Sequence, residues 1–336
     1  MTPLVSVIIP TANRPHYLPR AVKSALAGMP PGEVEVIVVP NGPDQSWQKS
    51  LQVFANNAAV RVIPITHGNA NVARNIGLMN ARGNYVRFLD DDDYLYPNAA
   101  VEQYKILEKS DADVVSGNVD IVDEMGIRLD IWIQPNIEDF CVAILGPWRA
   151  CLTTAHVYRT TAVRKITWVP SVTLRQDVHW LFELCTASDL KWKRLSESVG
   201  AWVQHPNARV SLASTGDSSG GLTIPARYRD RDKATVKILL STYRRLAEQD
   251  RLTPARQEAV ALGLWGCVHS SFFLNPIDWT QVAKTALEIY PDSRPIQPIY
   301  AWPGFRHLSP IAIQWLLLPK RWLGYRIRYF RKRNRF

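Results

Sequence analysis

The sequence predicts an α/β fold in which helices flank a mostly parallel sheet. Short runs of apolar, β-branched residues recur in the N-terminal part without polar alternation, as in strands that are buried on both faces. Each run is followed by a segment of helical length, which is the alternation that a parallel sheet requires. The last run ends in four consecutive aspartates, Asp90–Asp93. Because open α/β sheets bind ligands just beyond the carboxyl ends of their strands, we expect the site at this edge.

The expected elements follow one another in a simple order. Gly28 and the two prolines after it end the first helix, and Gly83 ends the third. Neither GxxxxGK nor GxGxxG occurs, so a glycine-rich phosphate loop is not expected. The expected strands are residues 4–10, 34–39, 60–64 and 85–89, and the expected helices are residues 17–27, a segment that ends near residue 57, and residues 71–81.

Composition narrows the class of protein. The 336 residues are 46% hydrophobic and 21% charged, which suits a small number of folded domains. The four cysteines lie far apart without a CxxC pair, so we expect neither a zinc site nor a disulfide framework, and a reducing, cytosolic location. The N-terminus has no basic region followed by a long apolar stretch, and no segment approaches the roughly 20 apolar residues that span a bilayer.

The four aspartates are the strongest candidate for a site. Adjacent carboxylates repel one another, and no basic residue lies within the run. A hard divalent cation that prefers oxygen ligands, Mn²⁺ or Mg²⁺, would relieve that repulsion. The alternative is a solvated acidic turn. The apolar strand before the run, together with Tyr94 and Pro97 after it, favours the site.

Several segments together resemble the family 2 glycosyltransferases. Three strings are similar to the donor-binding half of that family, and the likeness continues beyond them. The resemblance implies a GT-A fold, a nucleoside-diphosphate-sugar donor, a divalent metal and inversion at the anomeric carbon. The strings are VSVIIPTANRPHYLPRAVKSAL, VEVIVVPNG and NVARNIGLMNARGNYVRFLDDDDYLYP, and the further segments are residues 111–126, 174–184 and, more loosely, 199–211.

The resemblance also implies roles for single residues. Asp92 stands at the position of the metal ligand, and His205 matches a histidine that some members bring to the metal or the diphosphate. Asp177 stands where the family has its catalytic aspartate, at the start of a helix. The residues implied in donor binding are Thr11, Asn41, Arg74, Asp90 and Asp91.

The chain departs from the family pattern at several positions. The family commonly has an aromatic residue where Ala12 stands, and two aspartates where Pro40 and Asn41 stand. Asn41 can still accept a hydrogen bond, but without the added strength of a charged acceptor. The sequence therefore does not decide which nucleobase the donor carries. Gln176 replaces a glutamate that usually precedes the catalytic aspartate, which removes one charge and leaves the base.

Each implied residue also has a structural interpretation. Asp177 is of a residue type favoured at the N-cap of a helix. His205 could be a structural histidine. Arg74 could be a surface arginine of its helix, and Asn41 with Gly42 could be no more than a tight turn.

The second half of the chain is expected to be helical. Residues 214–221 form a polar, glycine-rich break, which is either a plain linker or a loop that orders over the bound donor. We expect a GT-A domain over residues 1–215, a flexible loop over 216–224 and a helical extension over 225–292. The donor half of the domain is residues 1–130, the acceptor half is 131–215, and the helices of the extension are 225–249, 254–273 and 279–290.

The formal net charge of +10 lies at the C-terminal end. No acidic residue follows Asp292 but ten Lys and Arg do, so the rest of the chain is neutral. Residues 293–336 are therefore expected to form a basic, aromatic tail, and within 319–333 aromatic side chains gather on one side at helical spacing. Such a segment fits an anionic membrane surface. Nucleic acid is not expected as a partner, because the neutral body offers no basic stripe. The remaining alternative is a solvated, disordered end.

These observations predict a metal-dependent, inverting glycosyltransferase at the inner face of the cell membrane, in polysaccharide or cell-surface glycan biosynthesis. Its partners would be a nucleotide-sugar donor, a glycan or lipid-linked acceptor and the membrane surface. A sugar nucleotidyltransferase would carry a glycine-rich, Lys/Arg-bearing loop after the first strand, and residues 11–15 are not one. A catalytically silent carbohydrate- or partner-binding module is the other alternative, and loss of Asp177 or of the acidic run would have favoured it.

Overall fold

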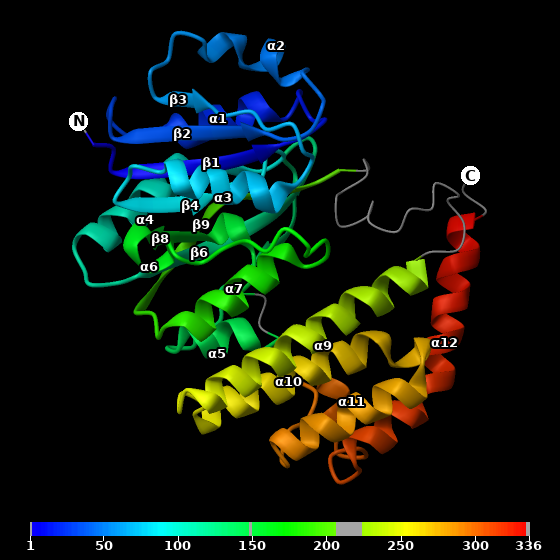
Figure 1. Cartoon of the computed structure of the whole chain (residues 1–336). Coiled ribbons are helices and arrows are strands. Elements are labelled where there is room, and N and C mark those ends of the chain that lie inside the picture. Colours follow the sequence, from blue (N-terminus) through cyan, green and yellow to red (C-terminus); the bar gives the residue numbers. More distant parts are fainter. Residues whose placement is uncertain (1, 148–149, 206–223, 334–336) are drawn as a thin grey trace. The chain divides into compact units, whose positions relative to one another are not determined.

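The structure is a computed structural model, which describes residues 2–147, 150–205 and 224–333. Its internal contacts divide the chain into two compact units, Met1–Ile144 with Trp148–Val210, and Leu145–Pro147 with Ser211–Phe336. The first unit contains the sheet, and the second is helical (Figure 1). The polar break at 214–221 lies outside the described residues, as do the side chains of 224–229 and 325–333.

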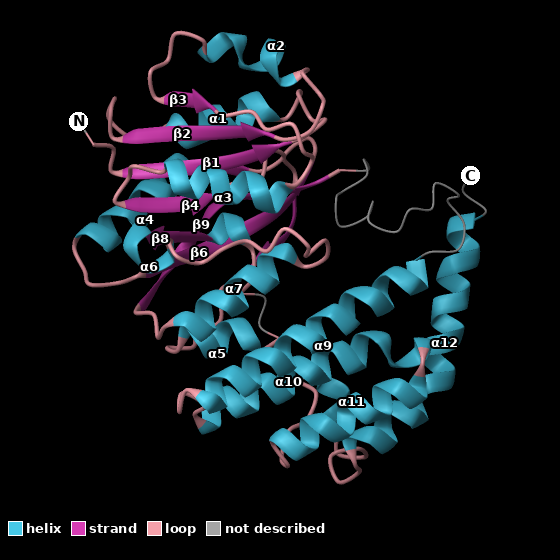
Figure 2. Cartoon of the chain, viewed as in Figure 1, coloured by secondary structure: helices cyan, strands magenta, loops and turns pink. Residues whose placement is uncertain are grey.

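A nine-stranded sheet forms the centre of the first unit (Figure 2). Its order is β3-β2-β1-β4-β8-β6-β9-β5, and β7 pairs with β6. Strands β3, β2, β1 and β4 are parallel, as predicted, and β6 is parallel to β9. The remaining pairs are antiparallel. The strands are β1 Val5–Thr11, β2 Val34–Pro40, β3 Val60–Val62, β4 Tyr85–Phe88, β5 Tyr94–Leu95, β6 Val114–Asp123, β7 Arg128–Trp132, β8 His156–Arg159 and β9 Trp192–Gln204.

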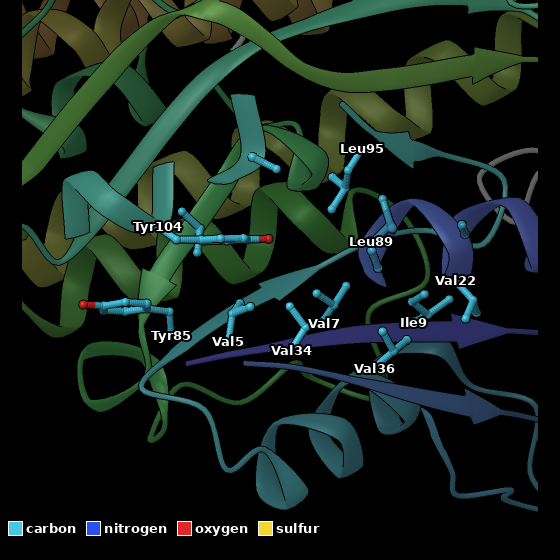
Figure 3. Close-up of a cluster of buried hydrophobic side chains, with 14 of the residues drawn as sticks. Val5, Val7, Ile9, Val22, Val34, Val36, Tyr85, Leu89, Leu95 and Tyr104 are labelled. Carbon is cyan, nitrogen blue, oxygen red and sulfur yellow. The ribbon is translucent and has the colours of Figure 1, made fainter. Parts of the chain in front are cut away.

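The apolar runs of the sequence form the interior of this sheet. Every residue of β1 and β2 is buried, which is why these strands show no polar alternation. Figure 3 shows Val5, Val7 and Ile9 of β1 beside Val34 and Val36 of β2, in one apolar cluster. Burial of such side chains stabilises the fold by about 1.5–3 kcal/mol each.

Helices cover the sheet, and the predicted ones are present. The second helix is shorter than predicted and continues as a 3₁₀ turn over Gln52–Phe54. Helix α3 begins at an Asn69 N-cap, whose side chain accepts from the main-chain nitrogens of Asn71 and Val72. The helices of this unit are α1 Leu18–Leu26, α2 Trp47–Leu51, α3 Ala70–Asn80, α4 Pro97–Glu108, α5 Phe140–Leu145, α6 Thr160–Val163 and α7 Gln176–Ala187.

The register of the parallel strands brings their carboxyl ends to one edge. Val5 of β1 lies opposite both Val34 of β2 and Tyr85 of β4. The carboxyl ends of these three strands therefore lie side by side. Thr11 is the last residue of β1, and Asn41 and the acidic run follow β2 and β4. This edge is where the sequence places the site.

Three strands on the other side of the sheet are joined by a buried polar chain. Trp192 Nε1 donates to Ser116 Oγ at 2.8 Å, and Ser116 Oγ lies 2.6 Å from His156 Nδ1. His156 Nε2 lies 2.7 Å from the carbonyl oxygen of Ala150. The neutral tautomer with its proton on Nε2 satisfies every group, whereas an imidazolium would leave the serine proton without an acceptor. Burial accordingly lowers the pKa of His156 from 6.5 to about 4.

Acid is expected to destabilise the protein through His156. The unfolded chain takes up this proton near pH 6.5 and the folded chain only near pH 4, so stability is lost as the pH falls below 6.5. Between pH 7 and pH 5 the loss should be about 2 kcal/mol in the free energy of unfolding. Urea titrations of the wild type and of His156→Gln at both pH values test this, because the variant should lose less. His67→Gln, at an exposed position, is the control. An equal pH dependence of wild type and His156→Gln would contradict the assignment.

The second unit is built from helices, close to the predicted bounds. Helices α10 and α11 begin with side-chain N-caps, Thr253 and Asn275, each followed by proline at the first helical position. Helix α12 runs through Pro319 into the basic tail. No helix in the described part of the chain is long and apolar enough to cross a membrane. The helices are α9 Ile224–Glu248, α10 Pro254–Ser271, α11 Pro276–Ile289 and α12 Pro310–Arg333.

Candidate active site

The acidic run forms a tight turn directly after β4. The main-chain nitrogen of Asp93 donates to the carbonyl oxygen of Asp90 at 3.1 Å, and β5 follows at Tyr94. One carboxylate oxygen each of Asp90, Asp92 and Asp93 lies within 4.8 Å of the others. Three hard oxygen donors at this separation suit Mg²⁺ or Mn²⁺. The carboxylate cluster therefore fits a divalent cation.

Asp93 belongs to this cluster, although it was not among the predicted site residues. Its Oδ2 accepts from Thr154 Oγ1 at 2.8 Å, and its Oδ1 accepts from the main-chain nitrogen of Val203 in β9 at 3.0 Å. Burial raises the pKa of Asp93 well above its usual value, and the negative charges of Asp92 and Asp90 raise it further. With both oxygens engaged, Asp93 anchors the turn against β9.

Asp91 points away from the cluster, toward the end of β1. Its Oδ2 accepts from Thr11 Oγ1 at 2.6 Å. Burial raises the pKa of Asp91 to about 7, and the neighbouring Asp92 adds to the rise. Asn41 directly follows β2, and its Nδ2 donates to the carbonyl oxygen of Thr11 at 2.9 Å. The structure thus links Thr11 to both Asp91 and Asn41, and their roles in donor binding stay predictions.

Asp92 is contacted by three cationic or titratable side chains. Arg14 Nη1 and His205 Nε2 lie 2.5 Å and 2.8 Å from the same oxygen, Asp92 Oδ2. Arg20 Nη2 donates to the main-chain oxygen of Asp92 at 2.9 Å. His205 follows β9, and its ring lies 5.1 Å from that of Tyr17. The structure therefore brings His205 from far along the chain to Asp92, and its role as a metal ligand stays a prediction.

Arg74 connects the acidic turn to helix α7. Its Nη2 pairs with Asp90 Oδ1 at 2.8 Å, and its Nη1 donates to Gln176 Oε1 at 3.1 Å. The guanidinium also lies 4.5 Å from the ring centre of Trp168. Arg74 is 7% exposed, so it is not a free surface arginine of its helix.

Asp177 lies in the first turn of α7, but it is not the N-cap. That position belongs to Arg175, whose φ of 55° is left-handed, and no side chain caps the helix. The carboxylate of Asp177 accepts from the main-chain nitrogen of Val178. Burial raises the pKa of Asp177, while the positive charge of Arg175 opposes the rise. The Asp177 carboxylate also interacts electrostatically with Asp90, so the predicted base and the acidic turn share one electrostatic environment.

Sequence reasoning missed several residues that hold this site together. Asp93 lies within the acidic run that the sequence analysis singles out, although it was given no role of its own. The others are charged or aromatic side chains whose partners are distant in sequence, so no local pattern marks them. Arg14 offered a weak signal, because it is a cation in the loop directly after the first strand. The missed residues are Arg14, Tyr17, Arg20, Asp93 and Trp168.

The arrangement has the parts needed for chemistry on an anionic substrate. The carboxylate cluster can hold a cation, and Arg14, Arg20 and Arg74 add three positive charges around it. Guanidinium groups recognise phosphate oxygens. A carboxylate with a raised pKa, Asp177, lies on the helix that Arg74 joins to the cluster. A raised pKa lies closer to the working pH, where a general base is most effective.

Part of the chain is similar in sequence to known glycosyltransferases. Residues 6–135 match the model of glycosyl transferase family 2. An uncharacterized glycosyltransferase of Rickettsia felis is 32% identical over 136 residues, which are 40% of this chain and 22% of that protein. Glycosyltransferase GlyG of Streptococcus pneumoniae is 31% identical over 148 residues, 44% of this chain and 48% of that one. The chain thus matches between about a fifth and a half of the length of these relatives.

A solved structure extends the likeness of fold over most of the chain. Staphylococcus aureus TarS, residues 1–349, in complex with UDP-GlcNAc, superposes with a TM-score of 0.56 and 16% identity. The match covers 85% of this chain and 89% of that one. The predicted fold is confirmed by this match and by the parallel sheet flanked by helices. The chain is therefore similar over residues 6–135 to glycosyl transferase family 2, and it has the GT-A fold.

Proposed function

We propose that this protein transfers a sugar from a nucleoside-diphosphate-sugar to a hydroxyl group of a glycan or lipid-linked acceptor, with inversion and with a divalent metal. The observation that carries the proposal is the link from the carboxylate cluster through Arg74 to the helix that bears Asp177. In the proposed reaction, a cation stabilises the leaving diphosphate on one side of the bond that breaks, and a base activates the acceptor hydroxyl on the other side. The TarS structure contains UDP-GlcNAc, which supports a nucleotide-sugar as the donor class.

Each residue has a defined task in this mechanism. The cluster of Asp90, Asp92 and Asp93, with His205 beside Asp92, would hold Mn²⁺ or Mg²⁺, which when bound neutralises the charge on the leaving diphosphate. Arg74, whose guanidinium lies over the ring of Trp168, would bind phosphate oxygens. Asp177 accepts the proton of the acceptor hydroxyl, whose oxygen then attacks the anomeric carbon. A single displacement of this kind inverts the configuration at that carbon.

The residues that we assign to the nucleobase do not select one base over another. The amide nitrogen of Asn41 donates to the carbonyl oxygen of Thr11. Its side-chain oxygen can therefore accept a hydrogen bond from the nucleobase. Thr11 is tied to Asp91, which we assign to the ribose. These contacts support a nucleotide donor without choosing between bases.

A donor panel tests the proposal directly. Purified protein is incubated with UDP-, GDP- and dTDP-sugars in Mn²⁺, Mg²⁺ or EDTA, and release of the nucleoside diphosphate is measured. At least one donor should be turned over or hydrolysed, and EDTA should stop the release. If no donor is bound or hydrolysed under any condition, the protein is a silent binding module instead.

We also propose that helix α12 holds the enzyme on an anionic membrane, next to a lipid-linked acceptor. Ile313 and Gln314 of this helix are fully buried, whereas Trp322 and Leu323 are 46% and 56% exposed. Ten basic and no acidic residues follow Asp292. Basic residues near anionic lipid each add about 1 kcal/mol, and exposed aromatic side chains suit the interface. Tyr325, Tyr329 and Phe330, on which the sequence prediction also rests, have side chains outside the described residues.

Replacing the exposed apolar pair should release the protein from vesicles. Trp322→Ser with Leu323→Ser is expected to lower co-sedimentation with anionic liposomes severalfold at low salt, and high salt should release the wild type as well. Ile277→Ser, at a position of α11 that is 71% exposed, is the matched control. Equal sedimentation of the double variant and the control would refute the assignment of α12 to the membrane.

A further inference from the structure

The guanidinium of Arg14 lies against Asp92, a member of the carboxylate cluster, and against the neighbouring Asp91. Its Nη1 is 2.5 Å from Asp92 Oδ2 and 3.3 Å from Asp91 Oδ1. The Arg14 side chain is 18% exposed, so it borders solvent, and it comes from the loop that follows β1. Both of these contacts are with carboxylates. One of them, Asp92, is a carboxylate that would bind a divalent cation.

A second arginine beside the same turn is attached differently. Arg20 donates to the main-chain oxygen of Asp92 and lies 4.7 Å from the ring centre of Tyr94. Neither contact uses a carboxylate oxygen, so a cation bound by the carboxylates would leave Arg20 in place. Of these two arginines, Arg14 is the one that competes with a metal for Asp92 Oδ2.

A guanidinium and a divalent cation at the same carboxylate oxygen weaken each other's binding. A guanidinium that donates to Asp92 Oδ2 occupies a lone pair and adds a positive charge at close range, and both oppose a divalent ion. A diphosphate offers the guanidinium new oxygens with the same planar, charged geometry. Arrival of the diphosphate can thus draw Arg14 away from Asp92 and bring negative charge to the metal at the same time.

We propose that Arg14 is a positioning residue that makes binding of the divalent cation depend on the nucleoside diphosphate. This inference rests on the proposed function and deepens it. Without a diphosphate, Arg14 neutralises Asp91 and Asp92, and the cation binds weakly. With a diphosphate, Arg14 pairs with phosphate oxygens and the carboxylates take the cation. Because such coupling is reciprocal, the cation raises the affinity for the diphosphate by the same factor.

Binding of Mn²⁺ alone, measured by the electron paramagnetic resonance signal of the free ion, tests the inference without turnover. Arg14→Gln should bind Mn²⁺ at least about tenfold more tightly than the wild type, as changes next to a metal ligand commonly alter affinity by ~10–100-fold. Arg14→Lys keeps the charge and should stay near the wild type. Arg128→Gln, at an exposed position, removes the same net charge elsewhere and should change the affinity by less than about twofold.

The same titration with UDP or GDP present measures the coupling. Nucleotide should tighten Mn²⁺ binding strongly in the wild type and much less in Arg14→Gln, and circular dichroism confirms that the variants are folded. If folded Arg14→Gln binds Mn²⁺ no more tightly than the wild type, Arg14 is a fixed partner of the carboxylates and the inference is overturned. If the wild type binds Mn²⁺ in neither condition, the metal dependence in the proposed function fails, and the inference fails with it.

Discussion

Asp92→Asn is expected to abolish metal-dependent donor binding and sugar transfer while the protein stays folded. The amide keeps the shape of the side chain but removes the charge that Arg14 and His205 share at Oδ2. Metal ions commonly supply several kcal/mol of charge stabilisation to a transition state, so kcat/KM should fall by about 10²–10³-fold or more. Titration of Mn²⁺ and nucleotide-sugar by calorimetry, together with the rate of diphosphate release, measures both effects.

A surface aspartate provides the matched control for this change. Asp111 is 75% exposed in its side chain and pairs only with the similarly exposed Lys191 among the contacts described. Asp111→Asn should therefore leave binding and turnover unchanged. Full turnover by Asp92→Asn in Mn²⁺ or Mg²⁺ would show that the acidic turn does not act through Asp92.

Asp177→Asn is expected to lower kcat by ~10²–10⁴-fold with donor affinity largely kept, because an amide cannot accept the proton of the acceptor hydroxyl. A second signature is the pH profile. Burial raises the pKa of Asp177, so the wild-type base is protonated, and its rate lost, as the pH falls through a value above the ordinary 3.8. The residual rate of the variant should lack that acidic limb. Steady-state kinetics between pH 4 and 8 with a donor found by the panel measure both.

A control variant at an acidic residue in the first turn of another helix distinguishes a loss of catalysis from a loss of helix stability. Asp278 occupies the first turn of α11 and its side chain is 52% exposed. Asp278→Asn should cost stability on the scale of ~0.3–1 kcal/mol, as loss of a charge near a helix N-terminus does, without a change in kcat. If Asp177→Asn shows only such a stability loss, or loses donor affinity while kcat survives, then Asp177 serves the structure of α7.

The strands and helices of the donor half could be predicted because their signals are local. In β1 and β2 every side chain is buried, so the apolar runs are continuous and unambiguous. Strand β9 was not predicted, because exposed residues such as Lys193 and Arg194 interrupt its apolar positions. Its place is decided by long-range pairing with β6, where the register shifts at irregularities that no local pattern encodes.

The candidate site divides in the same way. From residue type and spacing one can predict that a buried strand ends in four carboxylates, that an aspartate stands near the start of a later helix, and that positive charge gathers at the C-terminal end. These features depend on residue type and spacing alone, and a resemblance to known motifs could assign them expected roles.

Which partner each of these four carboxylates contacts is visible in the folded structure and not in the sequence. The run looks uniform in sequence, yet Asp91 turns toward Thr11, Asp93 is held by Thr154 and Val203, and Asp90 and Asp92 pair with different arginines. Those partners come from segments far apart in the chain. Hydrogen bonds and ion pairs act over a few ångströms, so their pairing becomes defined only when folding brings such segments to the same edge of the sheet.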